Sequence, residues 1–297
     1  MIKIIVLGTS GSTPTKTRGM PSVALVREGD VYLFDCGEGT QMRMMQYDVN
    51  ISRIKAIFIT HAHGDHIIGI AGLVRTLALN NRVEPLLIFV PKGYEKVLMS
   101  LITFDKAMIR YNIDIRGIGS GIIMKGKGFL VKAFRLKHSI PSYGYVFKED
   151  DKRRFIKEKC GKLGIKNEMY SLLEKTGSIK VKGKSVRIED VTWLQHGKKI
   201  VYATDTRPCA NTVKASLGAD VLIHEATFAE NEKKHALLRK HSTAKEAAGV
   251  AKKADAKMLV LMHISARYRS PKQLQEEAEA VFKNTVVAKD GYAIALE

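Results

Sequence analysis

The chain has 297 residues, 45% of them apolar, and its 49 Lys and Arg against 30 Asp and Glu give a formal net charge of +19. This size and composition suit a globular protein of one large domain or two smaller ones, and no stretch reaches the roughly 18 uninterrupted apolar residues of a membrane span. Three cysteines without a Cys-x-x-Cys pair exclude a disulfide scaffold and favour a cytoplasmic location, while the positive charge favours nucleic acid over an anionic membrane as partner, unless it reflects a basic proteome.

Strand-like runs fill the N-terminal third, and strands alternate with helical patterns further along the chain. The expected strands span 2–7, 22–27, 30–35, 55–60, 86–90, 129–135, 143–147, 199–203, 220–223, 257–262 and 292–296. The expected helices span about 67–79, 92–103, 242–253 and 271–283, the last opened by Ser270 and Pro271 as cap and first-turn proline. This mixture predicts an α/β fold in which two sheets pack face to face with helices outside them.

The segment 148–190 differs from the rest of the chain. It holds thirteen basic and eight acidic residues and few core-sized apolar ones. We therefore expect an insertion that projects from the body of the protein and is largely solvated. Composition leaves open whether this insertion is a plain surface excursion or an arm that holds a substrate.

A histidine cluster follows the expected strand 55–60. The run ITHAHGDH places three of the nine histidines and one aspartate within six positions: His61, His63, Asp65 and His66. Helical spacing resumes after it, so the cluster lies where a buried strand turns into a helix. Imidazole and carboxylate groups are ligands for zinc-like ions, and side chains of such a turn can converge on one point. We interpret the cluster as a metal site for more than one ion, rather than a solvated loop or a core network.

Three later candidates also follow expected strands: His138, Asp205 and His263. With the first cluster they make seven ligands, enough for two ions that share one carboxylate. A structural role would be the ordinary interpretation of each residue alone, but their repeated placement favours a joint site. Asp35 also ends a strand. It could accept a hydrogen bond from a ligating histidine and so fix that ring without binding the metal itself, or it could cap a turn.

Seven segments, in this order and spacing, resemble those of the ribonuclease Z family, the tRNA 3′-processing endoribonucleases of the metallo-β-lactamase superfamily: FDCGEGTQ, THAHGDH, LKHSIPSYGY, YATDTRP, HEATF, HST and HISARY. The resemblance covers almost the entire chain. It implies one αββα sandwich of the metallo-β-lactamase type over 1–297, with an inserted basic tRNA-binding arm at 148–190. It also implies a homodimer that cuts the 3′ trailer from precursor tRNA, leaving a 3′-hydroxyl on the tRNA and a 5′-phosphate on the trailer.

The resemblance also implies a role for each site residue. One zinc ion would be held by His61, His63 and His138, and the second by Asp65, His66 and His263, with Asp205 bridging. Asp65 would orient the nucleophile, and His241, tuned by Glu225, would protonate the leaving 3′ oxygen. Lys16, Arg18 and Arg267 would contact the RNA backbone. The chain departs from the family pattern at Gly19, where the family loop has Asn, and in LGIKNEMY at 163–170, which lacks the Gly-Pro element usual in the arm.

Two other functions stay open on the sequence. A small-molecule phosphodiesterase of the same superfamily would keep the site, but it needs neither the +19 charge nor the inserted segment. An RNA-binding module in which zinc only stabilises the fold is the other alternative. Structural zinc sites are commonly built from Cys and His, whereas the ligands here are His and Asp, as in open catalytic sites.

Overall fold

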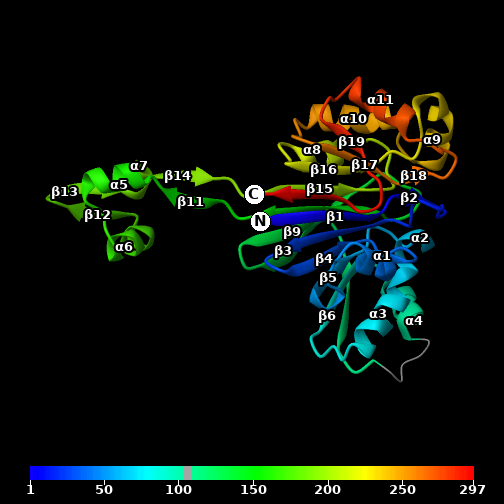
Figure 1. The fold of residues 1–297 in the computed structure, drawn as a ribbon, viewed down its shortest axis with the longest axis horizontal. Helices are drawn as coiled ribbons and strands as arrows, with labels where there is room; N and C mark the ends of the chain where they lie inside the picture. The colour runs from blue at the N-terminus through cyan, green and yellow to red at the C-terminus, as the bar shows by residue number, and fades with distance from the viewer. Residues whose placement is uncertain (104–108) are drawn as a thin grey trace. The chain divides into compact units, whose positions relative to one another are not determined.

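The computed structural model of the chain describes residues 1–103 and 109–297. These residues form two compact units, one made of Met1–Phe147 with Lys199–Glu297 and the other of Lys148–Lys198. The larger unit holds two seven-stranded sheets with helices on their outer faces, as Figure 1 shows. No helix among the described residues combines the length and the apolar composition needed to cross a membrane.

The first sheet has the strand order β20-β1-β3-β4-β5-β6-β7. Its strands are β1 Ile2–Gly8, β3 Ser22–Arg27, β4 Asp30–Phe34, β5 Ile54–Phe58, β6 Leu86–Pro91, β7 Ile113–Ile118 and β20 Tyr292–Leu296. Pairing is antiparallel from β20 to β4 and parallel from β4 to β7. The carboxyl ends of the parallel strands therefore share one edge of the sheet, and the histidine cluster follows β5 there.

The second sheet has the strand order β19-β17-β16-β15-β10-β9-β8. Its strands are β8 Gly121–Gly126, β9 Phe129–Arg135, β10 Tyr143–Glu149, β15 Lys199–Ala203, β16 Val221–Glu225, β17 Leu259–Met262 and β19 Thr285–Val287. Strands β15, β16, β17 and β19 run parallel. A short parallel pair, β2 Ser10–Gly11 and β18 Ile264–Ser265, joins loops of the N-terminal and C-terminal halves.

The inner faces of the two sheets share one apolar core. Because successive side chains of a strand point to opposite faces, Phe58 of β5 packs inward with Tyr145 and Tyr202 of the second sheet, while Ile57 packs outward against Leu73 of a covering helix. The helices on the outer faces are α1 Thr40–Gln46, α3 Gly69–Leu79 and α4 Glu95–Thr103 on the first sheet, and α8 Ala210–Ser216, α10 Ala244–Lys253 and α11 Lys272–Glu279 on the second (Figure 1). The layers follow the predicted αββα order.

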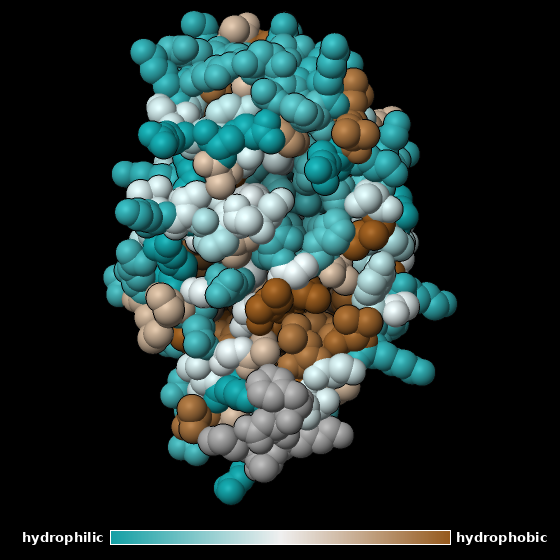
Figure 2. All heavy atoms as spheres, turned by 90° about the vertical axis from the view of Figure 1, so that its right-hand side faces the viewer, coloured by the Kyte–Doolittle hydropathy of each residue, from teal (hydrophilic) through white to brown (hydrophobic). Residues whose placement is uncertain are grey.

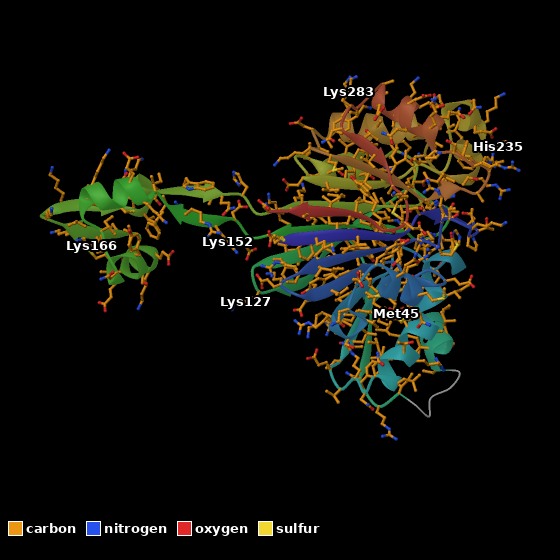
Figure 3. The ribbon with its side chains drawn as sticks, in the orientation of Figure 1. Met45, Lys127, Lys152, Lys166, His235 and Lys283 are labelled. Atoms are coloured by element: carbon orange, nitrogen blue, oxygen red, sulfur yellow. The ribbon has the colours of Figure 1, made fainter. Side chains whose placement is uncertain are left out.

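The unit Lys148–Lys198 has a small core of its own. Its elements are β11 Lys152–Phe155, α5 Lys157–Leu163, α6 Glu168–Thr176, β12 Ser178–Val181, β13 Lys184–Arg187, α7 Ile188–Val191 and β14 Thr192–Gln195. Most residues of 148–190 are exposed, as predicted for a largely solvated segment, but Cys160, Leu173 and Val191 are fully buried in a small core that was not predicted. Each short element contributes only one or two apolar residues, so no stretch of the sequence has the pattern of a core segment. The fold brings these separate residues together. Charged side chains, among them Lys152 and Lys166, cover the surface of this unit (Figure 3).

Every predicted strand is present, with ends shifted by at most two residues. Predicted helices begin and end less accurately, because helix ends carry weaker sequence signals than helix centres. Helix α11 begins at Lys272, so Pro271 is the N-cap residue rather than part of the first turn, and the helix ends at Glu279 rather than at 283. Among the strands of the two large sheets, β7, β8 and β19 were missed, since all three are edge strands with few buried side chains.

Candidate metal centre and active site

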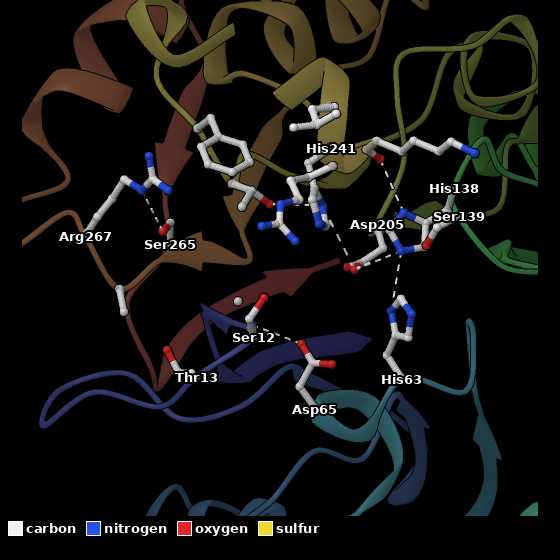
Figure 4. A pocket seen from close by; sticks show the side chains of 17 residues that line it. Ser12, Thr13, His63, Asp65, His138, Ser139, Asp205, His241, Ser265 and Arg267 are labelled. Atoms are coloured by element: carbon white, nitrogen blue, oxygen red, sulfur yellow. Dashed lines mark hydrogen bonds and ion pairs between the residues drawn. The ribbon is translucent and has the colours of Figure 1, made fainter. Parts of the chain in front are cut away.

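The seven candidate ligands lie at the ends of strands from both sheets. His61 and His63 follow β5, while Asp65 and His66 belong to the short helix α2 Gly64–Ile67. The other three follow strands of the second sheet: His138 after β9, Asp205 after β15 and His263 after β17. Figure 4 shows four of these side chains, from both sheets, around one cavity.

Ligand atoms of these residues form two groups. In the first, one atom each of His61, His63, His138 and Asp205 all lie within 4.8 Å of one another, and the same holds in the second for Asp65, His66 and His263. Asp205 also approaches the second group, because its Oδ1 is 3.0 Å from Nε2 of His263 and 3.3 Å from Nε2 of His66. Its carboxylate therefore lies between the two groups, and all seven candidates belong to one cluster.

The chemistry of these side chains fits bound divalent cations. Nε2 of His66 and Nε2 of His263 are buried and have no hydrogen-bond partner. A buried polar atom without a partner is costly, and a cation at this position would remove that cost. Imidazole nitrogens and carboxylate oxygens without thiolates are typical of metal sites that keep an open position for chemistry.

The carboxylate of Asp35 is fully buried beside the second group. It lies 2.8 Å from Nδ1 of His66 and accepts hydrogen bonds from the backbone N–H of Thr60 at 2.8 Å and the hydroxyl of Tyr202 at 3.0 Å. Burial alone would lower the pKa of His66, but Asp35 and Asp205 raise it well above its usual value. Asp35 thus holds the ring of His66 with Nε2 directed away from it, toward the other ligands.

Glu225, the last residue of β16, forms a buried pair with His241. Its Oε1 lies 2.9 Å from Nδ1 of His241, and its two oxygens also accept from the backbone N–H groups of Thr206 at 2.5 Å and Ser242 at 3.1 Å. Burial would raise the pKa of Glu225, but His241 lowers it to about 2. Burial would likewise lower the pKa of His241, but Glu225 raises it to about 9. His241 therefore carries a proton at neutral pH.

Arg207 fixes the backbone at His241. Its guanidinium donates to the carbonyl oxygen of His241 at 2.6 Å and forms two hydrogen bonds with Glu246, at 2.7 and 2.5 Å. Glu246 also forms a capping box with Thr243 at the start of α10. The ring of His241 is thus held from Nδ1 and from its own main chain, with one nitrogen left for a substrate.

A cavity of about 630 Å³ opens over these groups. Ser12 lines it and donates its backbone N–H to Oδ2 of Asp65 at 3.0 Å, as Figure 4 shows. Lys240 and Arg267 contribute positive charge to its rim. The cavity is therefore open, and its lining includes candidate metal ligands, the protonated side chain of His241 and the cationic side chains of Lys240 and Arg267.

The three candidate RNA-contacting residues differ in their surroundings. Lys16 is exposed. The guanidinium of Arg18 donates to Oγ1 of Thr9 and to the carbonyl oxygen of Ala288, both at 2.7 Å, so it ties its loop to the C-terminal segment. Arg267 lines the cavity, where its guanidinium lies 4.9 Å from the ring centre of Phe228 and 2.9 Å from a carboxylate oxygen of Glu232.

Sequence reasoning missed several residues that hold the site together. Thr60 and Thr227 bond to candidate ligands through their hydroxyls, Ser12 acts through its backbone N–H, and Arg207 acts through its guanidinium on the backbone of His241. The only sequence signal for the threonines is their position beside motif residues, one before His61 and two after Glu225.

The comparisons with known proteins agree with this geometry. Residues 2–158 match the family model of the anti-Pycsar protein Apyc1, and residues 180–264 match the β-lactamase superfamily domain. The chain is 42% identical to the ribonuclease Z of Archaeoglobus fulgidus and 38% identical to that of Methanosarcina acetivorans, in each case over 98% of this chain and 96% of the relative. The chain belongs to the ribonuclease Z family. The ribonuclease Z relatives decide this, because they extend across both matched segments and the residues between them.

The ribonuclease Z fold is also found in a solved structure. The short form of human tRNase Z superposes with a TM-score of 0.72 at 27% identity, covering 99% of each chain. The predicted metallo-β-lactamase type of αββα sandwich is thereby confirmed, as is the predicted resemblance to ribonuclease Z.

Proposed function

We propose that this chain is a metal-dependent endoribonuclease that cleaves the 3′ trailer from precursor tRNA. The observation that carries the proposal is the combination of full-length ribonuclease Z relatives with seven clustered His and Asp side chains, four of which line an open cavity. A phosphodiester bond is cleaved at neutral pH only if a nucleophile is available, the charge on the phosphate is neutralised and the leaving oxygen receives a proton. This cavity offers groups for all three tasks.

The proposed cofactor is a pair of zinc ions. His61, His63 and His138 would hold one ion and Asp65, His66 and His263 the other, with Asp205 between them. Such ions supply charge neutralisation and a nucleophile at neutral pH. The unpartnered Nε2 atoms of His66 and His263 support this assignment.

The side chains around the ions have separate proposed roles. Asp65, fixed by the N–H of Ser12, orients the attacking water. That water adds to phosphorus as the bond to the 3′ oxygen breaks, and His241 gives its proton to the departing oxygen. Glu225 keeps that proton on His241 by raising its pKa to about 9. The products are a tRNA with a 3′-hydroxyl and a trailer with a 5′-phosphate.

We further propose that the basic segment 148–190 binds the tRNA backbone, together with Lys16, Arg18 and Arg267. Thirteen basic residues in this segment support this role, because phosphate contacts supply most of the affinity of proteins for nucleic acids. Arg267 lines the cavity and can meet a phosphate near the cut. The bonds of Arg18 to Thr9 and Ala288 favour a contribution through the shape of its loop.

A homodimer is the proposed assembly. Helices α1 and α3 leave large apolar side chains exposed, with 63% of Met42, 60% of Met45 and 63% of Leu79 accessible. Figure 2 shows apolar side chains gathered in the lower half of one face. Contiguous apolar surface on a protein of this charge is typical of an interaction site. A second copy of the chain is the proposed partner for this apolar surface. The proposed location of the enzyme is the cytoplasm.

Cleavage of a labelled precursor tRNA tests the proposed function. Zinc-loaded protein should release the trailer with a 5′-phosphate, and protein stripped by a chelator should not. The Asp65→Ala variant should be inactive, whereas Glu276→Gln, which changes an exposed side chain of α11, should cleave at the wild-type rate. If the zinc-loaded wild type leaves the trailer attached, the proposal fails. Cleavage of a cyclic nucleotide but not of the precursor would instead support the small-molecule alternative.

A further inference from the structure

Thr227 connects Glu225 to a candidate metal ligand. Its hydroxyl oxygen is buried, 2.6 Å from Oε2 of Glu225 and 2.9 Å from Nδ1 of His263. A hydroxyl has one proton to donate. Ionised Glu225 can only accept a hydrogen bond, so the Thr227 proton goes to Glu225 and the hydroxyl oxygen accepts from Nδ1–H of His263.

This arrangement fixes the tautomer of His263. With its proton on Nδ1, the ring keeps a free lone pair on Nε2, the atom that is buried without a partner. That atom lies 3.0 Å from Oδ1 of Asp205 and 3.6 Å from Oδ2 of Asp65, among the other ligand atoms. The hydroxyl of Thr227 therefore holds His263 in the form that can ligate a cation.

Thr60 repeats the arrangement on the other sheet. Its buried hydroxyl oxygen lies 3.0 and 2.9 Å from the two oxygens of Asp35 and 3.0 Å from Nδ1 of His61. By the same count of protons, the hydroxyl donates to Asp35 and accepts from Nδ1–H of His61. His61 is left with its lone pair on Nε2, which is 3.4 Å from Oδ2 of Asp205.

The two buried carboxylates thus serve two histidines each. Asp35 contacts Nδ1 of His66 directly, and it reaches His61 through Thr60. Glu225 contacts Nδ1 of His241 directly, and it reaches His263 through Thr227. Each carboxylate therefore bonds one histidine directly and a second histidine through a threonine hydroxyl. The hydrogen-bonded sequence of carboxylate, threonine and histidine thus occurs once at the end of a first-sheet strand and once at the end of a second-sheet strand.

We propose that Thr60 and Thr227 are positioning residues of the metal centre. Each hydroxyl links a buried carboxylate to one ligating histidine and so fixes the tautomer of that histidine. The inference rests on the proposed metal-dependent function and adds the groups that prepare its ligands. Removal of outer groups that orient metal ligands typically lowers metal affinity by about 10- to 100-fold. Thr227 should act on the ion held by His263, and Thr60 on the ion held by His61.

Valine and serine substitutions separate this role from simple packing. Valine matches the shape of threonine but has no hydroxyl, whereas serine keeps the hydroxyl and loses a methyl group. The control is Thr212→Val, which alters a fully buried threonine whose hydroxyl lies 3.2 Å from Sγ of Cys209, away from the ligands. Each variant is stripped of metal, and its zinc affinity and stoichiometry are measured by competition with a chromophoric chelator. Circular dichroism monitors folding.

Thr227→Val should lose affinity for one zinc ion by about 10- to 100-fold while keeping the other, and Thr227→Ser and Thr212→Val should bind as the wild type does. If folded Thr227→Val binds two ions with wild-type affinity, the inference is overturned. If Thr227→Val does not fold, the Thr60→Val and Thr60→Ser pair decides by the same two results. A wild-type protein that binds no zinc overturns the proposed function itself, and that result is distinct from a failure of the valine variants.

Discussion

Three residues of the site have a backbone conformation that is rare outside glycine. Asp35, Asp205 and His263 have φ angles of 56°, 53° and 57°, and each follows the end of a strand. The left-handed conformation costs an ordinary residue about 1 to 2 kcal/mol. Its occurrence at three site residues is typical of functional positions, where the surrounding structure holds a strained backbone. The turn redirects each side chain from the strand toward the cluster of candidate ligands.

The pKa of His241 gives a pH prediction. Glu225 raises that pKa to about 9, so His241 is a proton donor below this pH and the rate of cleavage should fall as pH rises above it. Glu225→Gln removes the negative charge, lowers the pKa of His241 and should move the basic limb of the pH–rate profile to lower pH. The measurement is kcat/KM for a precursor tRNA between pH 6 and about 10.

Glu276→Gln serves as the control for this profile, because Glu276 is an exposed residue of α11 whose carboxylate lies 3.8 Å from Nζ of Lys272. Its basic limb should coincide with that of the wild type. An unchanged basic limb in Glu225→Gln would mean that His241 does not supply the proton.

The motif residues could be predicted from the sequence, but their supporting residues could not. His61, His63, Asp65 and His66 are neighbours in the chain, so their chemistry is visible in a short window. Thr60 has the look of an ordinary strand residue until Asp35, 25 positions earlier, is placed beside it. Thr227 contacts His263 across 36 positions. Hydrogen bonds at this separation depend on the packing of strands and have no local signal.

At the scale of elements, the inserted unit can be removed without opening the sheet. The backbone N–H of Glu149 donates to the carbonyl oxygen of Lys198 at 2.9 Å, so the two ends of the insertion are adjacent. Replacement of residues 151–196 by a short glycine linker should leave β10 and β15 in place. We predict that this variant keeps its rate on a small phosphodiester and loses at least tenfold in kcat/KM for precursor tRNA.

An equal loss on both substrates would show that the insertion supports the body of the protein rather than the RNA. A matched variant, with five basic residues of the segment 148–190 changed to Gln and the fold retained, should reproduce the effect of the deletion on tRNA alone. If neither variant weakens tRNA cleavage, the proposed arm function is wrong.

The elements themselves were predictable where burial is strong. Strands such as β6 and β17, whose residues are almost all buried, appear in the sequence as continuous apolar runs. Helix α1 was not predicted, because its seven residues bury only Thr40 and Met44. The insertion was recognised by its charge, but its small core was not, since the fold gathers single apolar residues from separate short elements.

At the scale of the whole molecule, the net charge of +19 predicts a salt-dependent encounter with RNA. Binding that neutralises several phosphates weakens steeply as salt rises. The affinity for precursor tRNA should fall by more than about tenfold between 50 and 200 mM salt, while hydrolysis of a small phosphodiester changes little. Filter binding and rate measurements over the same salt series test this, and a flat tRNA affinity would contradict it.

The apolar surface of α1 and α3 gives a prediction about assembly. Met45→Glu places a charge on a side chain that is 60% exposed, so a free surface would tolerate it and a dimer interface would not. Analytical ultracentrifugation should find a dimer for the wild type and a monomer for the variant. Leu217→Glu, at a 54% exposed position beyond the end of α8, should remain dimeric. A wild-type monomer would contradict the proposed assembly.

The central claim is that seven side chains from two sheets hold a pair of divalent cations. Anomalous diffraction at the zinc absorption edge, from crystals of zinc-loaded protein, tests it most directly. The account predicts two peaks, one about 2.0 to 2.2 Å from nitrogens of His61, His63 and His138, the other at the same range from ligand atoms of Asp65, His66 and His263, with Asp205 reaching both. No peak in this cavity, or a peak that avoids Asp205, would contradict it.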